Sequence, residues 1–123
     1  MDQNSVLSCS PNEEALIVRH TLLSNAGMNV TSVMTLTEAR FEIEMGRCGS
    51  LLICHRLSSP QLDDITTLFR RYCPKGRIVF VTGGTIPDHV PEAVDIYVPE
   101  SSGPLQILNA LQEFQSKRAA MAS

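Results

Sequence analysis

Two stretches of the chain, Leu51–Cys54 and Ile78–Val81, are apolar at every position. Such continuous runs are typical of strands that lie inside a parallel sheet with helices on both faces. Three further stretches have the composition of strands, at Ser5–Cys9, Met28–Val33 and Ile96–Val98. Because Met28–Val33 is half polar, we predict that it lies at an edge of the sheet.

Segments with apolar residues at helical spacing alternate with these strands. In the first, Ala15, Val18, Leu22 and Ala26 predict the buried face of a helix. The other sets are Leu36, Ala39 and Ile43, then Leu62, Ile65, Phe69 and Tyr72, and finally Leu105, Leu108, Leu111 and Phe114. This alternation predicts parallel strands joined by right-handed crossovers. We therefore predict one α/β domain with the flavodoxin-like strand order 2-1-3-4-5 and helices on both faces.

The connection between the last two predicted strands breaks this alternation. Residues 83–94 contain two prolines and two glycines, and at most about one helical turn fits among them. We therefore predict that the fourth helix of this fold is short or missing. Because loops often carry recognition, we also expect Ile86 and Val90 in this segment to contact a partner.

Composition narrows the function classes. The net charge is −3 at pH 7, without the basic excess that binding to nucleic acid requires. No apolar run approaches the roughly 20 residues that span a bilayer, and the first residues lack the cationic start of a signal peptide. We therefore expect a cytoplasmic protein that binds neither nucleic acid nor membrane. We assign residues 1–116 to the domain and residues 117–123 to a frayed tail.

Several segments resemble the receiver domain of two-component response regulators, the CheY-like fold. They are Val6–Glu13 with Ala26-Gly27 behind it, Leu51–His55, Val79–Gly83 and Asp95–Val98. In that family an acidic pair after the first strand holds Mg²⁺, and an aspartate at the end of the third strand takes the phosphoryl group. A serine or threonine ends the fourth strand, and a lysine follows the fifth. The resemblance thus implies a signalling domain of this type.

The resemblance places the acidic pair at Ser10 and Pro11, the phosphoacceptor at His55, the hydroxyl at Thr82 and the lysine at Glu100. We call these positions the degenerate phosphorylation pocket, because only Thr82 matches the family pattern. Mg²⁺ prefers carboxylate oxygens, which neither residue of the first pair supplies. We therefore expect a pseudo-receiver with no catalytic residues, no bound metal and no cofactor.

The resemblance also implies where a partner binds. In receivers, phosphorylation is read at the face formed by the fourth helix, the fifth strand and the last helix, often through dimerisation. Our candidates for partner contacts are Ile86, Val90 and Tyr97. We expect the partner to be a signalling protein or a second copy of this chain, so that the domain acts through protein–protein interaction.

The cysteines leave other functions open. They are Cys9, Cys48, Cys54 and Cys73, and their scattered positions predict buried free thiols. Cys9 and Cys54 end neighbouring strands near His55, which is compatible with a metal site, a redox pair or a small phosphotransfer enzyme using Cys9 and His55. However, cysteine phosphatases carry an arginine six positions after the nucleophile, where this chain has Ala15. A small-ligand sensor using the pocket of His55 and Thr82 is a third alternative.

Overall fold

The computed structural model describes residues 4–46, 49–83 and 92–122, and these contain one parallel sheet of five strands in the order β2-β1-β3-β4-β5. The strands are β1 (Ser5–Cys9), β2 (Asn29–Val33), β3 (Ser50–Cys54), β4 (Arg77–Thr82) and β5 (Ile96–Pro99). The predicted strand order is confirmed. The two continuous apolar runs form the interior strands β3 and β4, and the half-polar strand β2 lies at an edge.

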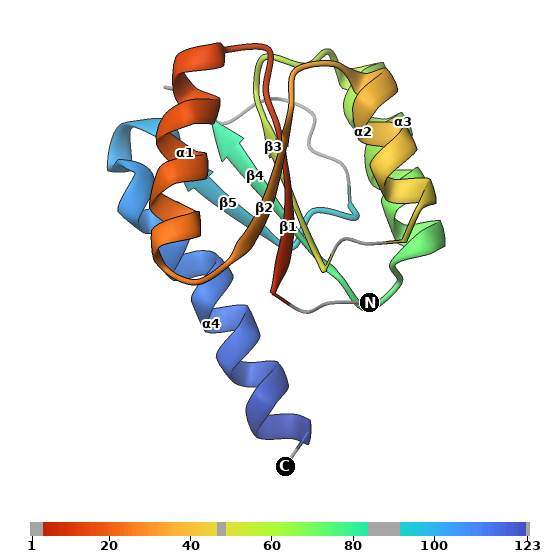
Figure 1. The fold of residues 1–123 in the computed structure, drawn as a ribbon. Helices are drawn as coiled ribbons and strands as arrows, with labels where there is room; N and C mark the ends of the chain where they lie inside the picture. Colours follow the sequence, from red (N-terminus) through yellow and green to blue (C-terminus); the bar gives the residue numbers. More distant parts are fainter. Residues whose placement is uncertain (1–3, 47–48, 84–91, 123) are drawn as a thin grey trace.

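Helices cover both faces of this sheet (Figure 1), which confirms the predicted flavodoxin-like fold. The helices are α1 (Glu13–Asn25), α2 (Leu36–Glu44), α3 (Ser59–Tyr72) and α4 (Pro104–Ala122), with a short 3₁₀ helix η1 (Glu100–Ser102) between β5 and α4. Helices α1 and α4 pack on one face, and α2 and α3 pack on the other. None of these helices is long and apolar enough to cross a lipid bilayer.

The prediction for the fourth helix falls largely on residues 84–91, which lie outside the described residues together with Ile86 and Val90. Residues 92–95, which lead into β5, form a turn and no helix. The boundary between domain and tail stays a prediction, although the structure continues α4 to Ala122.

The buried face of α1 differs from the predicted one. The structure buries Leu16, Arg19 and Leu23, whereas Val18 is 51% exposed and Ala26 is also exposed. The helix is apolar on two adjacent faces, so its pattern fits either orientation. Leucines remove more apolar area from water than alanines do, and this favours the face with Leu16 and Leu23.

The predicted faces of two other helices are wrong in part. In α4 the buried residues include Ile107, Ala110 and Leu111, while Leu105 is 61% exposed. In α3 the predicted stripe is buried except for Tyr72 in its last turn, which is exposed. The two exposed residues lie at helix ends, Leu105 in the first turn of α4 and Tyr72 in the last turn of α3.

A polar cluster fixes the segment before β5. The Asp95 carboxylate accepts hydrogen bonds from the Ile78 backbone N–H, at 2.7 Å, and from the Arg70 guanidinium. Arg70 also donates to the backbone carbonyls of Gly76 and Ala93. These contacts anchor the start of β5 to the end of α3 and to β4.

Because all five strands are parallel, their carboxyl ends share one edge of the sheet. This edge is where ligands bind in open α/β folds. Strand β1 begins, and helix α4 ends, at the opposite end of the molecule (Figure 1).

Candidate functional site

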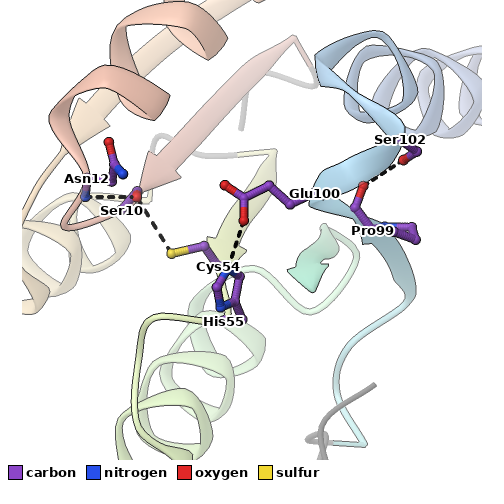
Figure 2. Close-up of polar contacts among 7 residues, drawn as sticks. All are labelled: Ser10, Asn12, Cys54, His55, Pro99, Glu100 and Ser102. Carbon is purple, nitrogen blue, oxygen red and sulfur yellow. Dashed lines mark hydrogen bonds and ion pairs between the residues drawn. The ribbon is translucent and has the colours of Figure 1, made fainter. Parts of the chain in front are cut away.

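The central feature of the carboxyl edge is a contact between His55, which follows β3, and Glu100, which follows β5 (Figure 2). The His55 Nε2 atom lies 2.9 Å from the Glu100 Oε2 atom. The His55 backbone N–H donates to the Val81 carbonyl at 2.9 Å, which ties the residue to the end of β4. A β-carbon added at Gly83 would lie 3.2 Å from the His55 Nδ1 atom, so the ring packs closely against this glycine.

Glu100 is positioned by the tight turn after β5. The Ser102 hydroxyl donates to the Pro99 carbonyl at 2.6 Å (Figure 2), and the Gly103 N–H donates to the Glu100 carbonyl at 3.2 Å. Gly103 has φ 89°, a backbone conformation in which glycine avoids the steric cost of a side chain. The turn therefore holds the Glu100 carboxylate above the end of the sheet.

The hydrogen bond with His55 is the main cause that lowers the pKa of Glu100, and nearby positive charges on Arg56 and Arg19 lower it further. Glu100 is therefore a carboxylate at neutral pH. Compared with the pattern that the resemblance implies, the acidic and the basic residue have exchanged places. The carboxylate follows β5, and the basic group follows β3.

The other predicted pocket residues offer no strong ligand. Ser10 is 1% exposed, and its hydroxyl oxygen accepts hydrogen bonds from the Asn12 N–H at 3.1 Å and the Cys54 thiol at 3.6 Å (Figure 2). Pro11 has no polar side-chain atom, and Thr82 is buried at the end of β4.

Mg²⁺ is usually held in proteins by one or two carboxylates, and Ser10 and Pro11 supply none. Among the described residues, no group of three or more His, Cys, Asp or Glu side chains is placed to hold a metal ion. The residues at this edge therefore do not fit the ion that the resemblance implies.

The cysteines at this edge do not form a reactive pair. Cys9 belongs to the core cluster beneath α2 and α3, whereas Cys54 belongs to the cluster beneath α1 and α4. Their side chains thus point to opposite faces of the sheet. Burial, with smaller contributions from Cys54 and Glu38, raises the pKa of Cys9 to about 11. A buried, protonated thiol is a poor nucleophile, which disfavours the cysteine enzyme.

The sequence matches no model of a known protein family and no curated protein. The structure, however, resembles solved receiver domains over almost its whole length. A response regulator receiver protein from Sinorhizobium medicae superposes with a TM-score of 0.78 and 19% identity, over 93% of this chain and 95% of that one. A receiver domain from Clostridium thermocellum gives a TM-score of 0.78 and 17% identity, over 95% and 98% of the two chains. The chain has the receiver fold.

A third similar structure is a response regulator from Burkholderia pseudomallei, solved with a phosphorylated aspartic acid, a calcium ion and citrate. It matches with a TM-score of 0.72 and 20% identity, over 97% of this chain and 72% of that one. Likeness at this level of identity shows the receiver fold and leaves the function to be argued from the residues.

This receiver fold also contains a pocket that the sequence did not predict, which we call the α1/α4 pocket. It has a volume of about 270 Å³ and lies between α1 and the first turn of α4. Its lining residues are Asn12, Glu14, Ala15, Val18, Arg19, Glu100, Gly103, Pro104 and Ile107. Arg19 was missed because a charged helical residue is expected on the solvated face. Its position three residues after Leu16 and four before Leu23 is the signal that places it on the buried face.

Of the predicted partner contacts, Tyr97 is the residue that the structure describes. It lies on the edge strand β5 and is 51% exposed. About half of its surface is therefore accessible to solvent.

Proposed function

We propose that the protein is a pseudo-receiver, a cytoplasmic signalling module that takes up no phosphoryl group and acts through protein–protein contacts. The pairing of His55 with Glu100 carries this proposal. It places an imidazole at the position that the resemblance assigns to the phosphoacceptor, and a carboxylate at the position assigned to the lysine. A phosphoryl group arriving at the end of β3 would meet the Glu100 carboxylate, and like charges repel.

The metal half of the pocket supports the same conclusion. Phosphoryl transfer depends on cations that neutralise the charge developing on the phosphoryl oxygens. Ser10 and Pro11 supply no carboxylate for such a metal ion, and the Ser10 hydroxyl is already engaged by Asn12 and Cys54. The module therefore has neither the acceptor nor the metal ligands of the family pattern, and no catalytic activity of its own.

A receiver fold without this switch would act through a constant binding surface. Tyr97 supports this role, because exposed aromatic side chains are enriched in protein interfaces. Together with Ile86 and Val90, which remain predicted contacts, it would form a surface for a signalling protein or for a second copy of the chain.

The phosphorylation half of the proposal is tested with acetyl phosphate and Mg²⁺, followed by intact-mass measurement. We expect no gain in mass for the natural chain. The matched control is a variant with the family pattern restored, Ser10→Asp, Pro11→Asp, His55→Asp and Glu100→Lys, which we expect to gain one phosphoryl group. A phosphoryl adduct on the natural chain that depends on Mg²⁺ would overturn the proposal.

The partner half is tested by comparing Tyr97→Ser with Tyr72→Ser. Tyr72 is also exposed but belongs to helix α3 and not to strand β5, so its substitution controls for the loss of an exposed tyrosine. We expect self-association in sedimentation velocity, or capture of a cognate signalling protein, to weaken for Tyr97→Ser alone. Equal effects of the two substitutions would contradict a binding surface at β5.

A further inference from the structure

Arg19 is the only charged side chain among the buried residues of the described chain, with 6% of its surface exposed. It lies on the face of α1 that packs toward the sheet and α4. Arginine usually extends its charged end into solvent, and so small an exposure means that little of the guanidinium does so here. A buried arginine is costly unless its donors are paired.

No hydrogen bond or ion pair joins the Arg19 guanidinium to another group of the described chain. Its charge nevertheless lowers the pKa of Glu100, so the two groups are near each other without touching. Arg19 lines the α1/α4 pocket, and Glu100 lines it too. The pocket thus contains the Arg19 cation, which has no hydrogen-bond or ion-pair partner among the described residues, and, separated from it, a carboxylate.

The walls of the pocket restrict the kind of molecule that fits. A volume of about 270 Å³ suits a molecule of few heavy atoms. Val18, Pro104 and Ile107 give the pocket an apolar wall, and Glu14 adds a second carboxylate to its lining. A guanidinium binds a carboxylate through two parallel hydrogen bonds, while two nearby carboxylates disfavour a multiply charged anion and favour a cationic group.

We propose that the α1/α4 pocket binds a small neutral α-amino acid, with its carboxylate on Arg19, its ammonium group toward Glu100 and Glu14, and its side chain against the apolar wall. This inference does not depend on the absence of phosphorylation. It gives the protein a small-molecule ligand at a site beside the His55–Glu100 pair. Because Glu100 lines the pocket and also pairs with His55, binding of the amino acid would change the environment of the His55 ring.

The experiment titrates the full chain with each neutral amino acid and follows backbone amide and His55 ring resonances by NMR. We expect at least one amino acid to give saturable shifts at Ala15, Arg19 and Gly103. The matched probes are the carboxylic acid that lacks the ammonium group, the amine that lacks the carboxylate, and inorganic phosphate. Each should bind at least tenfold more weakly than the amino acid.

Variants assign the contacts. Arg19→Met places an uncharged residue of similar length on the buried face of α1 and should weaken binding at least tenfold. Arg71→Met, on the exposed surface of α3, should leave binding unchanged. Arg19→Gln provides a second variant if Arg19→Met folds poorly. Glu100→Gln should weaken binding of the amino acid and not that of its carboxylic acid analogue.

Three results would overturn the proposal. They are no saturable binding of any neutral amino acid at millimolar concentration, tighter binding of phosphate than of every amino acid, and binding that is unchanged in both Arg19 variants. Each of these results leaves the phosphorylation test with acetyl phosphate untouched, so the two proposals fail separately.

Discussion

Replacing Asp95 with alanine removes two hydrogen bonds at the point where β5 begins. The carboxylate accepts the Ile78 backbone N–H at 2.7 Å and pairs with the Arg70 guanidinium. Because Glu100 follows β5, the same change loosens the segment that carries the carboxylate of the His55 pair. We therefore expect Asp95→Ala to lower the stability of the fold and to disturb the site.

The two lost contacts differ in energy. Ile78 is fully buried, so leaving its N–H without a partner costs about 1–3 kcal/mol. The pair of Arg70 and Asp95 has side chains that are 27% and 36% exposed, and pairs of this kind contribute about 0.2–1 kcal/mol. The sum predicts a loss of about 1–4 kcal/mol in the free energy of unfolding, most of it from the backbone contact.

Urea denaturation followed by circular dichroism measures this loss, with Asp64→Ala as the matched control. Asp64 is an exposed aspartate on α3, and its removal should change stability by less than about 0.5 kcal/mol. When Arg70 is already replaced by alanine, Asp95→Ala should still lower the free energy of unfolding, and the loss should be smaller only by the contribution of the Arg70–Asp95 ion pair. The reasoning is refuted if Asp95→Ala costs no more than Asp64→Ala, or if its cost disappears in the Arg70→Ala background.

Three further predictions concern single groups. The NMR-detected pKa of Glu100 should lie below the ordinary value and return toward it in His55→Ala. Because the pKa of Glu100 is lowered in the folded state, the stabilisation by His55 should be present above the ordinary glutamate pKa and lost as the pH falls through the lowered value. Equal loss of stability in acid for the natural chain and for His55→Ala would contradict this prediction. Cys9 should resist iodoacetamide in the folded protein at mildly alkaline pH and react after denaturation, as peptide mapping would show; fast labelling of the folded protein would contradict its burial. Gly76→Ala should cost about 1–3 kcal/mol, because the added β-carbon would lie 2.7 Å from Phe69 and 2.8 Å from a backbone carbonyl; an unchanged urea midpoint would refute this.

The fold was predictable because its strongest signals are local. The unbroken apolar runs of β3 and β4 exclude positions at the edges of the sheet, and the half-polar β2 favours one. The orientation of α1 was not predictable in the same way. Its apolar residues occupy two adjacent faces, and only the burial of Leu16 and Leu23 in the folded domain selects between these faces. A helix with one apolar stripe, such as α3, carries no such ambiguity along most of its length.

The candidate site was predictable in its location and not in its contacts. His55 follows β3 and Glu100 follows β5 of one parallel sheet, so both were expected at the carboxyl edge, with β4 between the two strands. That the two side chains meet depends on the turn from Pro99 to Gly103, whose geometry no periodicity encodes. Arg19 could not be identified before the orientation of α1 was known, because its burial follows from that orientation.

The arrangement of the chain ends has a practical consequence for all of these measurements. The carboxyl edge of the sheet and the starts of α1 and α4 lie at one end of the molecule, while β1 begins and α4 ends at the other (Figure 1). The residues that line the α1/α4 pocket belong to the starts of these helices and to the turn after β5. An affinity tag, a fluorescent protein or a linker to a biosensor chip attached at either terminus would therefore project away from the residues being probed. Immobilised protein should bind amino acids as the free chain does, so surface-based assays can replace solution titrations of the α1/α4 pocket when material is scarce.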